Sequence, residues 1–143
     1  MVGIVLISHG DLAKGIVSSA SMLVPQLDNV TSLTLWPEDN PDEFQEKLEA
    51  AVKAADTGDG VFILADMLGG TPANRAMYCI GERVRMMTGL SLPMLYSLIN
   101  IREETSDLEA LARDVMTEAK DAMVDVNEMI SSKDGELKNG SAE

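Results

Sequence analysis

The stretch of sequence that decides the fold is VGIVLISHGD, residues 2–11. Residues 2–7 form a continuous apolar run, which is typical of a strand covered on both faces in a parallel sheet. The run breaks into a polar turn that carries His9, the only histidine of the chain. In open parallel sheets, ligands gather at the carboxyl ends of the strands, because the next helix begins there with free backbone N–H groups. The stretch therefore predicts an imidazole in a functional position.

The same pattern of strand, turn and helix recurs along the chain. Short apolar runs predict further strands at residues 30–35, 61–65 and 84–87. Apolar residues at helical spacing, with their caps, predict helices at residues 12–23, 40–55, 73–83, 90–101 and 106–123. Strands that alternate with helices predict an α/β fold with a doubly wound, mainly parallel sheet. We expect the flavodoxin-like strand order 2-1-3-4, in which the first and third strands are neighbours.

The end of the chain has a different composition. Residues 123–130 are ambiguous between a frayed helix and an added strand. Residues 131–143 are mostly Ser, Lys, Asp, Gly, Glu and Asn, which cannot bury a core face. We therefore expect one domain at residues 1–130 and a polar, disordered tail at residues 131–143.

The composition narrows the range of partners. The chain has 143 residues, a formal net charge of −13, one Trp, two Tyr and two Phe. Nucleic acid and anionic membrane are therefore poor partner candidates, whereas a positively charged protein would be attracted. Solvated helix faces account for such a charge as well. A single cysteine excludes an intramolecular disulfide, and with no apolar stretch of membrane length we expect a cytoplasmic protein.

His9 has a predicted partner in Asp66, which ends the third predicted strand. In the expected strand order both residues lie at the same edge of the sheet. A carboxylate that accepts a hydrogen bond from one ring nitrogen fixes the tautomer and leaves the other nitrogen as a nucleophile. The loop after Asp66 holds Gly69, Gly70 and Thr71 at a predicted helix start, where backbone donors could hold a dianion. This pattern favours transient phosphorylation of the histidine.

Simpler interpretations exist for each motif. A lone His–Asp pair is often structural, and Gly-Gly-Thr-Pro is often only a turn with a helix cap. The coincidence of both motifs at the ends of two neighbouring strands favours a functional site. A metal site is disfavoured, because one histidine and one cysteine leave only carboxylates as further ligands.

Three segments resemble a known family: IVLISHG at residues 4–10, ADMLGGTPAN at 65–74 and LPML at 92–95. The chain is similar over about residues 1–130 to the enzyme IIA component of the mannose-family (mannose/fructose/sorbose) phosphoenolpyruvate-dependent sugar phosphotransferase system. The resemblance implies a cytoplasmic phosphocarrier in which His9 accepts a phosphoryl group from the phosphocarrier protein HPr through Nε2, as a tele-phosphohistidine. His9 would pass the group to a separate IIB component, which serves the IIC/IID membrane permease for sugar uptake.

The resemblance also implies roles for individual residues. Asp66 would orient His9 through Nδ1, with no metal or cofactor. The phosphoryl group would be lined by Gly10, Leu68, Gly69, Gly70 and Thr71. The family fold adds an antiparallel strand near the C-terminus, which is exchanged between the subunits of a homodimer, and residues 123–130 are the candidate for this strand.

Three other functions stay open at this point. One is the phosphotransferase subunit that serves dihydroxyacetone kinase, although the Gly-Gly-Thr-Pro loop argues against it. Another is a small tetrapyrrole metal chelatase, in which a strand also ends in His-Gly, but such chemistry generally needs more than one metal-contacting side chain. The third is a non-catalytic regulatory module that binds a phosphate-bearing ligand.

Overall fold

The computed structural model describes the backbone of residues 1–138 and the side chains of residues 1–132. Its centre is a parallel sheet of four strands in the order β2-β1-β3-β4. The strands are β1 (Gly3–His9), β2 (Val30–Leu35), β3 (Val61–Ala65) and β4 (Val84–Thr88). The α/β class, the parallel sheet and the 2-1-3-4 order predicted from the sequence are confirmed.

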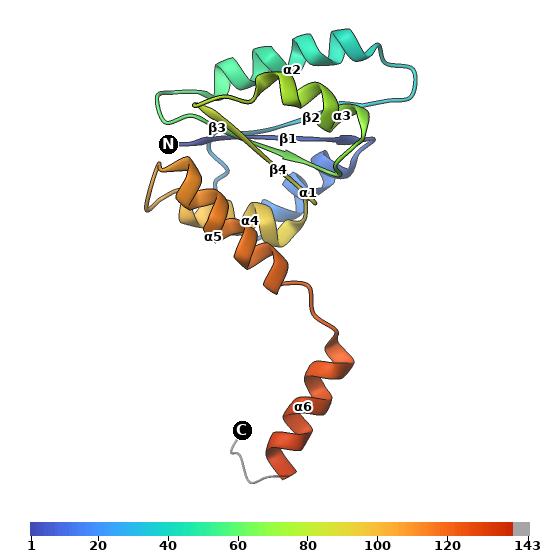
Figure 1. Cartoon of the computed structure of the whole chain (residues 1–143), viewed down its shortest axis with the longest axis vertical. Coiled ribbons are helices and arrows are strands. Elements are labelled where there is room, and N and C mark those ends of the chain that lie inside the picture. Colours follow the sequence, from blue (N-terminus) through green and yellow to red (C-terminus); the bar gives the residue numbers. More distant parts are fainter. Residues whose placement is uncertain (139–143) are drawn as a thin grey trace.

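Helices cover both faces of the sheet (Figure 1). One face carries α2 (Pro41–Ala55) and α3 (Thr71–Ala76), and α3 continues into a 3₁₀ turn, Met77–Cys79. The other face carries α1 (Leu12–Ala20), α4 (Leu92–Ile101) and α5 (Leu108–Asp121). No helix in the described part of the chain is long and apolar enough to cross a membrane.

The two central strands bury side chains on both faces, as their continuous apolar runs predict. Successive side chains of a strand point to opposite faces, so β1 and β3 each contribute to two cores. Ile4, Leu6, Phe62 and Leu64 pack with α1, α4 and α5. Val5, Ile7, Val61 and Ile63 pack with α2 and α3. The central strands are thereby fixed on both sides, which gives the residues at their ends a rigid base.

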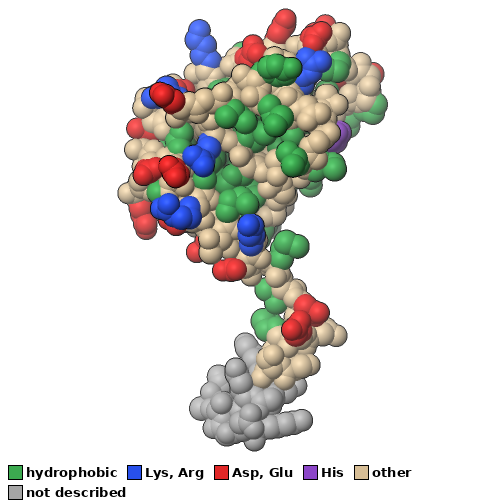
Figure 2. Space-filling model, in the orientation of Figure 1, with side chains coloured by type: hydrophobic (Ala, Val, Ile, Leu, Met, Phe, Trp, Pro, Cys, Tyr) green, Lys and Arg blue, Asp and Glu red, His purple; other side chains and the backbone are tan. Residues whose placement is uncertain are grey.

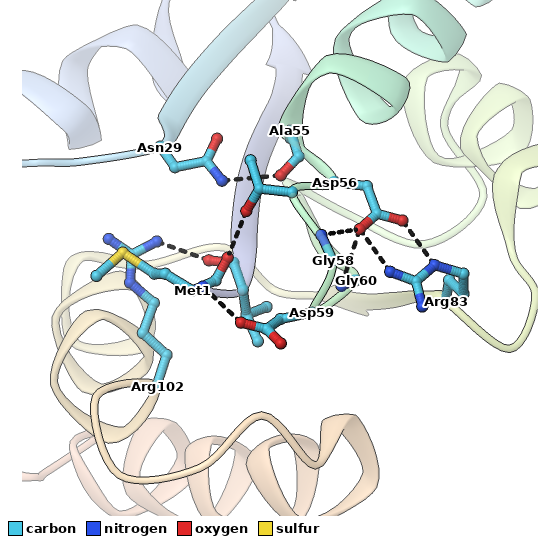
Figure 3. Close-up of polar contacts among 11 residues, drawn as sticks. Met1, Asn29, Ala55, Asp56, Gly58, Asp59, Gly60, Arg83 and Arg102 are labelled. Atoms are coloured by element: carbon cyan, nitrogen blue, oxygen red, sulfur yellow. Dashed lines mark hydrogen bonds and ion pairs between the residues drawn. The ribbon is translucent and has the colours of Figure 1, made fainter.

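The amino ends of the strands are held together by polar contacts (Figure 3). The Asp56 carboxylate accepts hydrogen bonds from Nε and Nη2 of Arg83, both at 2.7 Å, and from the N–H groups of Gly58 and Gly60. The pKa of Asp56 lies well below its ordinary value, mainly because the carboxylate accepts hydrogen bonds from the Arg83 side chain. Arg102 is buried beside this edge, where its guanidinium donates to backbone carbonyl oxygens. These contacts lie at the edge of the sheet opposite to His9.

Two predicted elements differ from the structure. The helix predicted at residues 73–83 starts at Thr71 and ends at Ala76, and the 3₁₀ turn that follows ends at Cys79. A longer helix is ruled out because the chain must turn back into β4, and Ile80 already has extended backbone angles. An isolated bridge between Gly81 and Val84 closes this turn.

Of the two alternatives for residues 123–130, a frayed helix or an added antiparallel strand, the structure does not show the strand. The chain instead forms α6 (Val126–Lys138), which projects away from the body (Figure 1). Asp125 explains the helix start, because its side chain accepts a hydrogen bond from the N–H of Glu128 at 3.2 Å and its carbonyl accepts one from Met129. The helix also includes residues 131–138, the first part of the predicted tail, whereas residues 139–143 lie outside the described residues.

Candidate functional site

The turn after β1 is built around a buried serine. Ser8 is fully buried, and its hydroxyl accepts a hydrogen bond from the N–H of Ala13 at 2.8 Å while it donates to the carbonyl of Gly10 at 3.1 Å. Gly10 has a φ of +57°, a left-handed conformation that favours glycine. The turn therefore reverses tightly into α1 and leaves the His9 side chain half exposed.

Asp66 lies directly behind the imidazole. The backbone N–H of Asp66 donates to the carbonyl of Ile7, so the parallel pairing of β1 and β3 brings the residue to His9. Its Oδ2 atom lies 2.7 Å from Nδ1 of His9 and also accepts the backbone N–H of His9 at 2.9 Å. Its Oδ1 atom accepts the N–H of Met67 at 2.9 Å. The predicted pairing of His9 with Asp66 is thus present as a contact in the structure.

The hydrogen bonds of Asp66 decide the tautomer of His9. Burial raises the pKa of Asp66, but the hydrogen bonds from the His9 backbone, the His9 ring and Met67 lower it more, so the carboxyl pKa lies below its ordinary value. An ionised carboxylate can only accept, so Nδ1 must carry the ring proton. The Nε2 atom then keeps its lone pair. The side chain of His9 is 50 % exposed, whereas the side chain of Asp66 is 10 % exposed.

The loop between β3 and α3 runs close to the imidazole. A Cβ atom on Gly70 would lie 2.6 Å from Cε1 and 3.2 Å from Nε2 of His9. The φ of Gly70 is −83°, which any residue can adopt, so the position requires glycine for space and not for conformation. The N–H group of Thr71 donates to no protein acceptor in the part of the chain that the structure describes. Thr71 lines the same hollow as His9, so a free backbone donor lies at this part of the site.

The structure brings most of the predicted phosphoryl-lining residues together. Gly10 and Thr71 line, with His9, a hollow of about 550 Å³. Gly70 lies against the ring, as described above. Leu68 is 67 % exposed, and a Cβ on Gly69 would meet no atom within 4 Å, so these two residues lie on the outer part of the loop.

The sequence analysis missed one side of the site, the connection between β2 and α2. Trp36, Asp39 and Pro41 line the same hollow as His9. The register explains this, because Leu35 pairs with His9 and residue 36 therefore follows at the same edge of the sheet. The predicted strand order contained the signal, since a strand next to the first one must end beside His9. Neither Trp36 nor Pro37 was among the site residues that the sequence predicted.

Positive charge is scarce around the imidazole. Arg75, which follows the glycine loop, donates to Asp42 at 2.6 Å and to Gln45 at 2.9 Å and so ties α3 to α2. Among the described residues, no lysine or arginine lines the hollow, and no group of three or more His, Cys, Asp or Glu side chains could hold a metal ion.

Comparisons with known proteins identify relatives of this chain. A family model described as "PTS system fructose IIA component" (EIIA-man) matches residues 3–116, a span that contains both His9 and Asp66. The chain is 30 % identical over 105 residues to the PTS system fructose-specific EIIA component of Bacillus subtilis (strain 168), with 72 % of each chain covered. It is also 30 % identical over 112 residues to the PTS system mannose-specific EIIAB component of Escherichia coli (strain K12).

The matches cover different shares of this chain and of its relatives. The match to the E. coli protein covers 77 % of this chain but only 35 % of that relative. Among solved structures, the mannose/sorbose specific IIA subunit of the phosphotransferase system from Enterococcus faecalis superposes with a TM-score of 0.76 at 29 % identity, covering 86 % of this chain and 92 % of that one. The matched family span ends before α6 begins.

Proposed function

The chain belongs to the EIIA-man family of phosphotransferase-system IIA components, and on this premise we propose that it carries a phosphoryl group on His9. The observation that carries the proposal is the His9–Asp66 contact of 2.7 Å, which leaves the Nε2 lone pair on a half-exposed side chain that lines the hollow. The relatives are sugar phosphotransferase components, which favours this function over a chelatase, a ligand-binding module or a subunit of dihydroxyacetone kinase.

The proposed reaction is a displacement at phosphorus. The Nε2 lone pair of His9 attacks the phosphorus of a phosphohistidine on the donor, the Nε2–P bond forms, and the donor's N–P bond breaks with its electron pair returning to the donor imidazole. The ring proton stays on Nδ1, where Asp66 offsets the positive charge that develops on the His9 ring. Transfer to the acceptor is the same displacement in the opposite direction. Positioning supplies most of the rate in such reactions, and Asp66 and the β1 turn fix the ring.

The predicted phosphoryl-lining residues have distinct places in this proposal. The N–H group of Thr71 would donate to a phosphoryl oxygen, because it is free and Thr71 lines the hollow with His9. Gly70 would leave room for the phosphoryl group, because it lies against the imidazole without a side chain. Gly10 would border the group from the β1 turn. Leu68 and Gly69 would contact the bound partner more than the phosphoryl group, since both lie on the exposed part of the loop.

The partners follow from the family. We propose that HPr is the donor, that a IIB protein is the acceptor, and that the group continues through IIB to a sugar permease. We also propose a homodimer. Its support is a segment that projects from the body with exposed apolar side chains, namely Met123, Val124, Val126, Met129 and Ile130. Sedimentation of the whole chain and of a variant that ends at residue 122 tests this, and a monomer in both cases contradicts it.

Intact mass spectrometry tests the phosphoryl acceptor. The chain is incubated with phosphoenolpyruvate, enzyme I and HPr, and its mass is taken before and after mild acid treatment. We expect one acid-labile phosphoryl group on the wild type and none on His9→Ala. No adduct on the wild type, with HPr itself phosphorylated, contradicts the proposal and leaves a phosphate-binding regulatory module as the better explanation.

Asp66→Asn tests the role of the carboxylate. The amide can donate to Nδ1 and so place the ring proton on Nε2, which removes the nucleophile. We expect a rate of transfer from phospho-HPr that is lower by roughly 10²- to 10⁴-fold, as for other catalytic histidines that lose their carboxylate. Asp59→Asn, at the opposite edge of the sheet, is the control. Equal rates for Asp66→Asn and the wild type would remove Asp66 from the mechanism.

A further inference from the structure

We propose that Ser8 is a positioning residue for the reaction at His9. Its buried hydroxyl holds the turn that carries the imidazole, so that the ring stays on Asp66 and Nε2 keeps its lone pair. The inference rests on the proposed function and extends it, since it adds a residue that acts on the rate of transfer without touching the phosphoryl group or a partner.

Ser8 is a polar residue in a place that suits an apolar one. Among the described residues, the buried polar or charged side chains are those of Ser8 and Arg102. Figure 2 shows the purple imidazole of His9 at the rim of the body, whereas the residue before it has no exposed surface. A buried hydroxyl destabilises the fold unless it forms hydrogen bonds. Ser8 therefore belongs in this place because of the two hydrogen bonds that its hydroxyl forms.

The first of these bonds supplies a missing helix cap. The first N–H groups of a helix have no partner within it, and the side chain of the N-cap residue usually accepts one of them. Asp11, the N-cap residue of α1, forms no such bond. Oγ of Ser8 instead accepts the buried N–H of Ala13 at 2.8 Å. The hydroxyl thereby joins the end of β1 to the start of α1 across the turn that holds His9.

The second bond restrains the backbone next to the imidazole. The hydroxyl donates to the carbonyl of Gly10 at 3.1 Å and so spans His9 itself. The N–H of Gly10 donates to the carbonyl of Leu35 at 3.0 Å, which holds the same residue from the side of β2. Glycine has more backbone freedom than other residues, and Gly10 has a φ of +57°. Without the hydroxyl, the turn after His9 would have more conformations to choose from.

The position of this backbone decides the chemistry of the ring. Oδ2 of Asp66 accepts the backbone N–H of His9 at 2.9 Å and lies 2.7 Å from Nδ1 of the same residue. A shift of the turn therefore disturbs both contacts at once. When the ring leaves the carboxylate, the proton is free to occupy Nε2, and that tautomer has no lone pair for the attack. Ser8 thus supports the rate of transfer but not the binding of the donor.

A steady-state assay of transfer from phospho-HPr tests the role of the hydroxyl. We expect Ser8→Ala to lower kcat by about 10-fold or more with KM nearly unchanged. Ser8→Thr keeps a hydroxyl on a side chain that suits a strand, and it should restore most of kcat. Ser91→Ala is the matched control, because it also removes a hydroxyl that caps a helix, here through the N–H of Met94 at 3.2 Å. Its helix, α4, follows β4, which is not a neighbour of β1.

The tautomer of the ring gives a second readout that does not depend on transfer. His9 is the only histidine of the chain, so the NMR chemical shifts of imidazole nitrogens report on this ring alone. At a pH at which the ring is neutral, we expect the Nδ1–H tautomer to dominate in the wild type. Ser8→Ala should raise the share of the Nε2–H tautomer, whereas Ser91→Ala should leave the share unchanged. Urea unfolding establishes that each variant is folded under the conditions of the assay.

The outcomes separate the inference from the function on which it rests. If the wild type accepts no phosphoryl group, the proposed function fails and the inference fails with it. If the wild type is phosphorylated but folded Ser8→Ala has the kcat or the tautomer of the wild type, only the inference is overturned. An equal loss of kcat in Ser91→Ala also overturns it, because the loss would then come from a weaker helix cap anywhere in the fold.

Discussion

Gly70→Ala should slow phosphoryl transfer strongly while it leaves the fold almost unchanged. The added Cβ would lie 2.6 Å from Cε1 of His9, whereas carbon atoms pack at about 3.5–4.0 Å. The imidazole and the loop must therefore separate by roughly 1 Å. The ring can move outward because it is half exposed, but this movement weakens the 2.7 Å contact of Nδ1 with Asp66.

The effect on rate should be much larger than the effect on stability. A misplacement of about 1 Å at a reacting group can cost about 10²-fold in rate, and we expect a loss of this size. The lost hydrogen bond costs about 1 kcal/mol of unfolding free energy. A Gly→Ala change at an ordinary φ regains about 0.4–1 kcal/mol, because the unfolded chain becomes less flexible. The net change in stability should therefore be within about 1 kcal/mol.

Rapid-quench transfer from phospho-HPr and urea unfolding measure these two effects. Gly15→Ala is the matched control, because a Cβ there, within α1, meets no atom within 4 Å. It should keep the wild-type rate and gain up to about 1 kcal/mol of stability. A Gly70→Ala variant that transfers at the wild-type rate would refute the argument that the loop and Asp66 together position the ring.

Three further predictions concern stability. The pKa of Asp56 is lower in the folded chain than the ordinary value of 3.8, so its contact with Arg83 contributes stability above that pH and loses it in acid. The melting-temperature difference between the wild type and Asp56→Asn should therefore shrink as the pH falls below about 4, and a constant difference contradicts this. Arg102→Met leaves two backbone carbonyls without their donor and should cost about 2–4 kcal/mol in urea unfolding, whereas a more stable variant would show that the buried charge is the larger cost. Deletion of residues 131–143 should leave the urea midpoint unchanged, and a lower midpoint would show that this segment supports the body.

The central sheet and the His9–Asp66 pair could be predicted because both depend on strong local patterns. Strands buried on both faces have continuous apolar runs, and residues at the ends of neighbouring strands must meet. Trp36 lay within reach of the same reasoning, since β2 is the other neighbour of β1. The requirement for glycine at position 70 could not be predicted, because it depends on a distance of a few ångströms between a loop and a ring.

The C-terminal segment is where the sequence patterns left two alternatives open, a frayed helix and an added strand. Residues 123–130 have a strand-like mixture of apolar and polar side chains, but Asp125 also offers a helix cap three residues before Glu128, and the helix forms. A local helix cap can decide the conformation of a segment where no neighbouring strand forms hydrogen bonds with its backbone. The family resemblance implied a strand here, and the family model itself matches only residues 3–116.

The scarcity of positive charge around His9 fits a carrier better than a conventional kinase site. A carrier must release its phosphoryl group as readily as it receives it, so strong binding of the phosphorylated state would stop the transfer. The free N–H group of Thr71 can orient the phosphoryl group without a full positive charge, and Arg75 is held by Asp42. Among the described residues, the hollow therefore lacks a lysine or arginine that would hold the phosphorylated state too tightly for exchange.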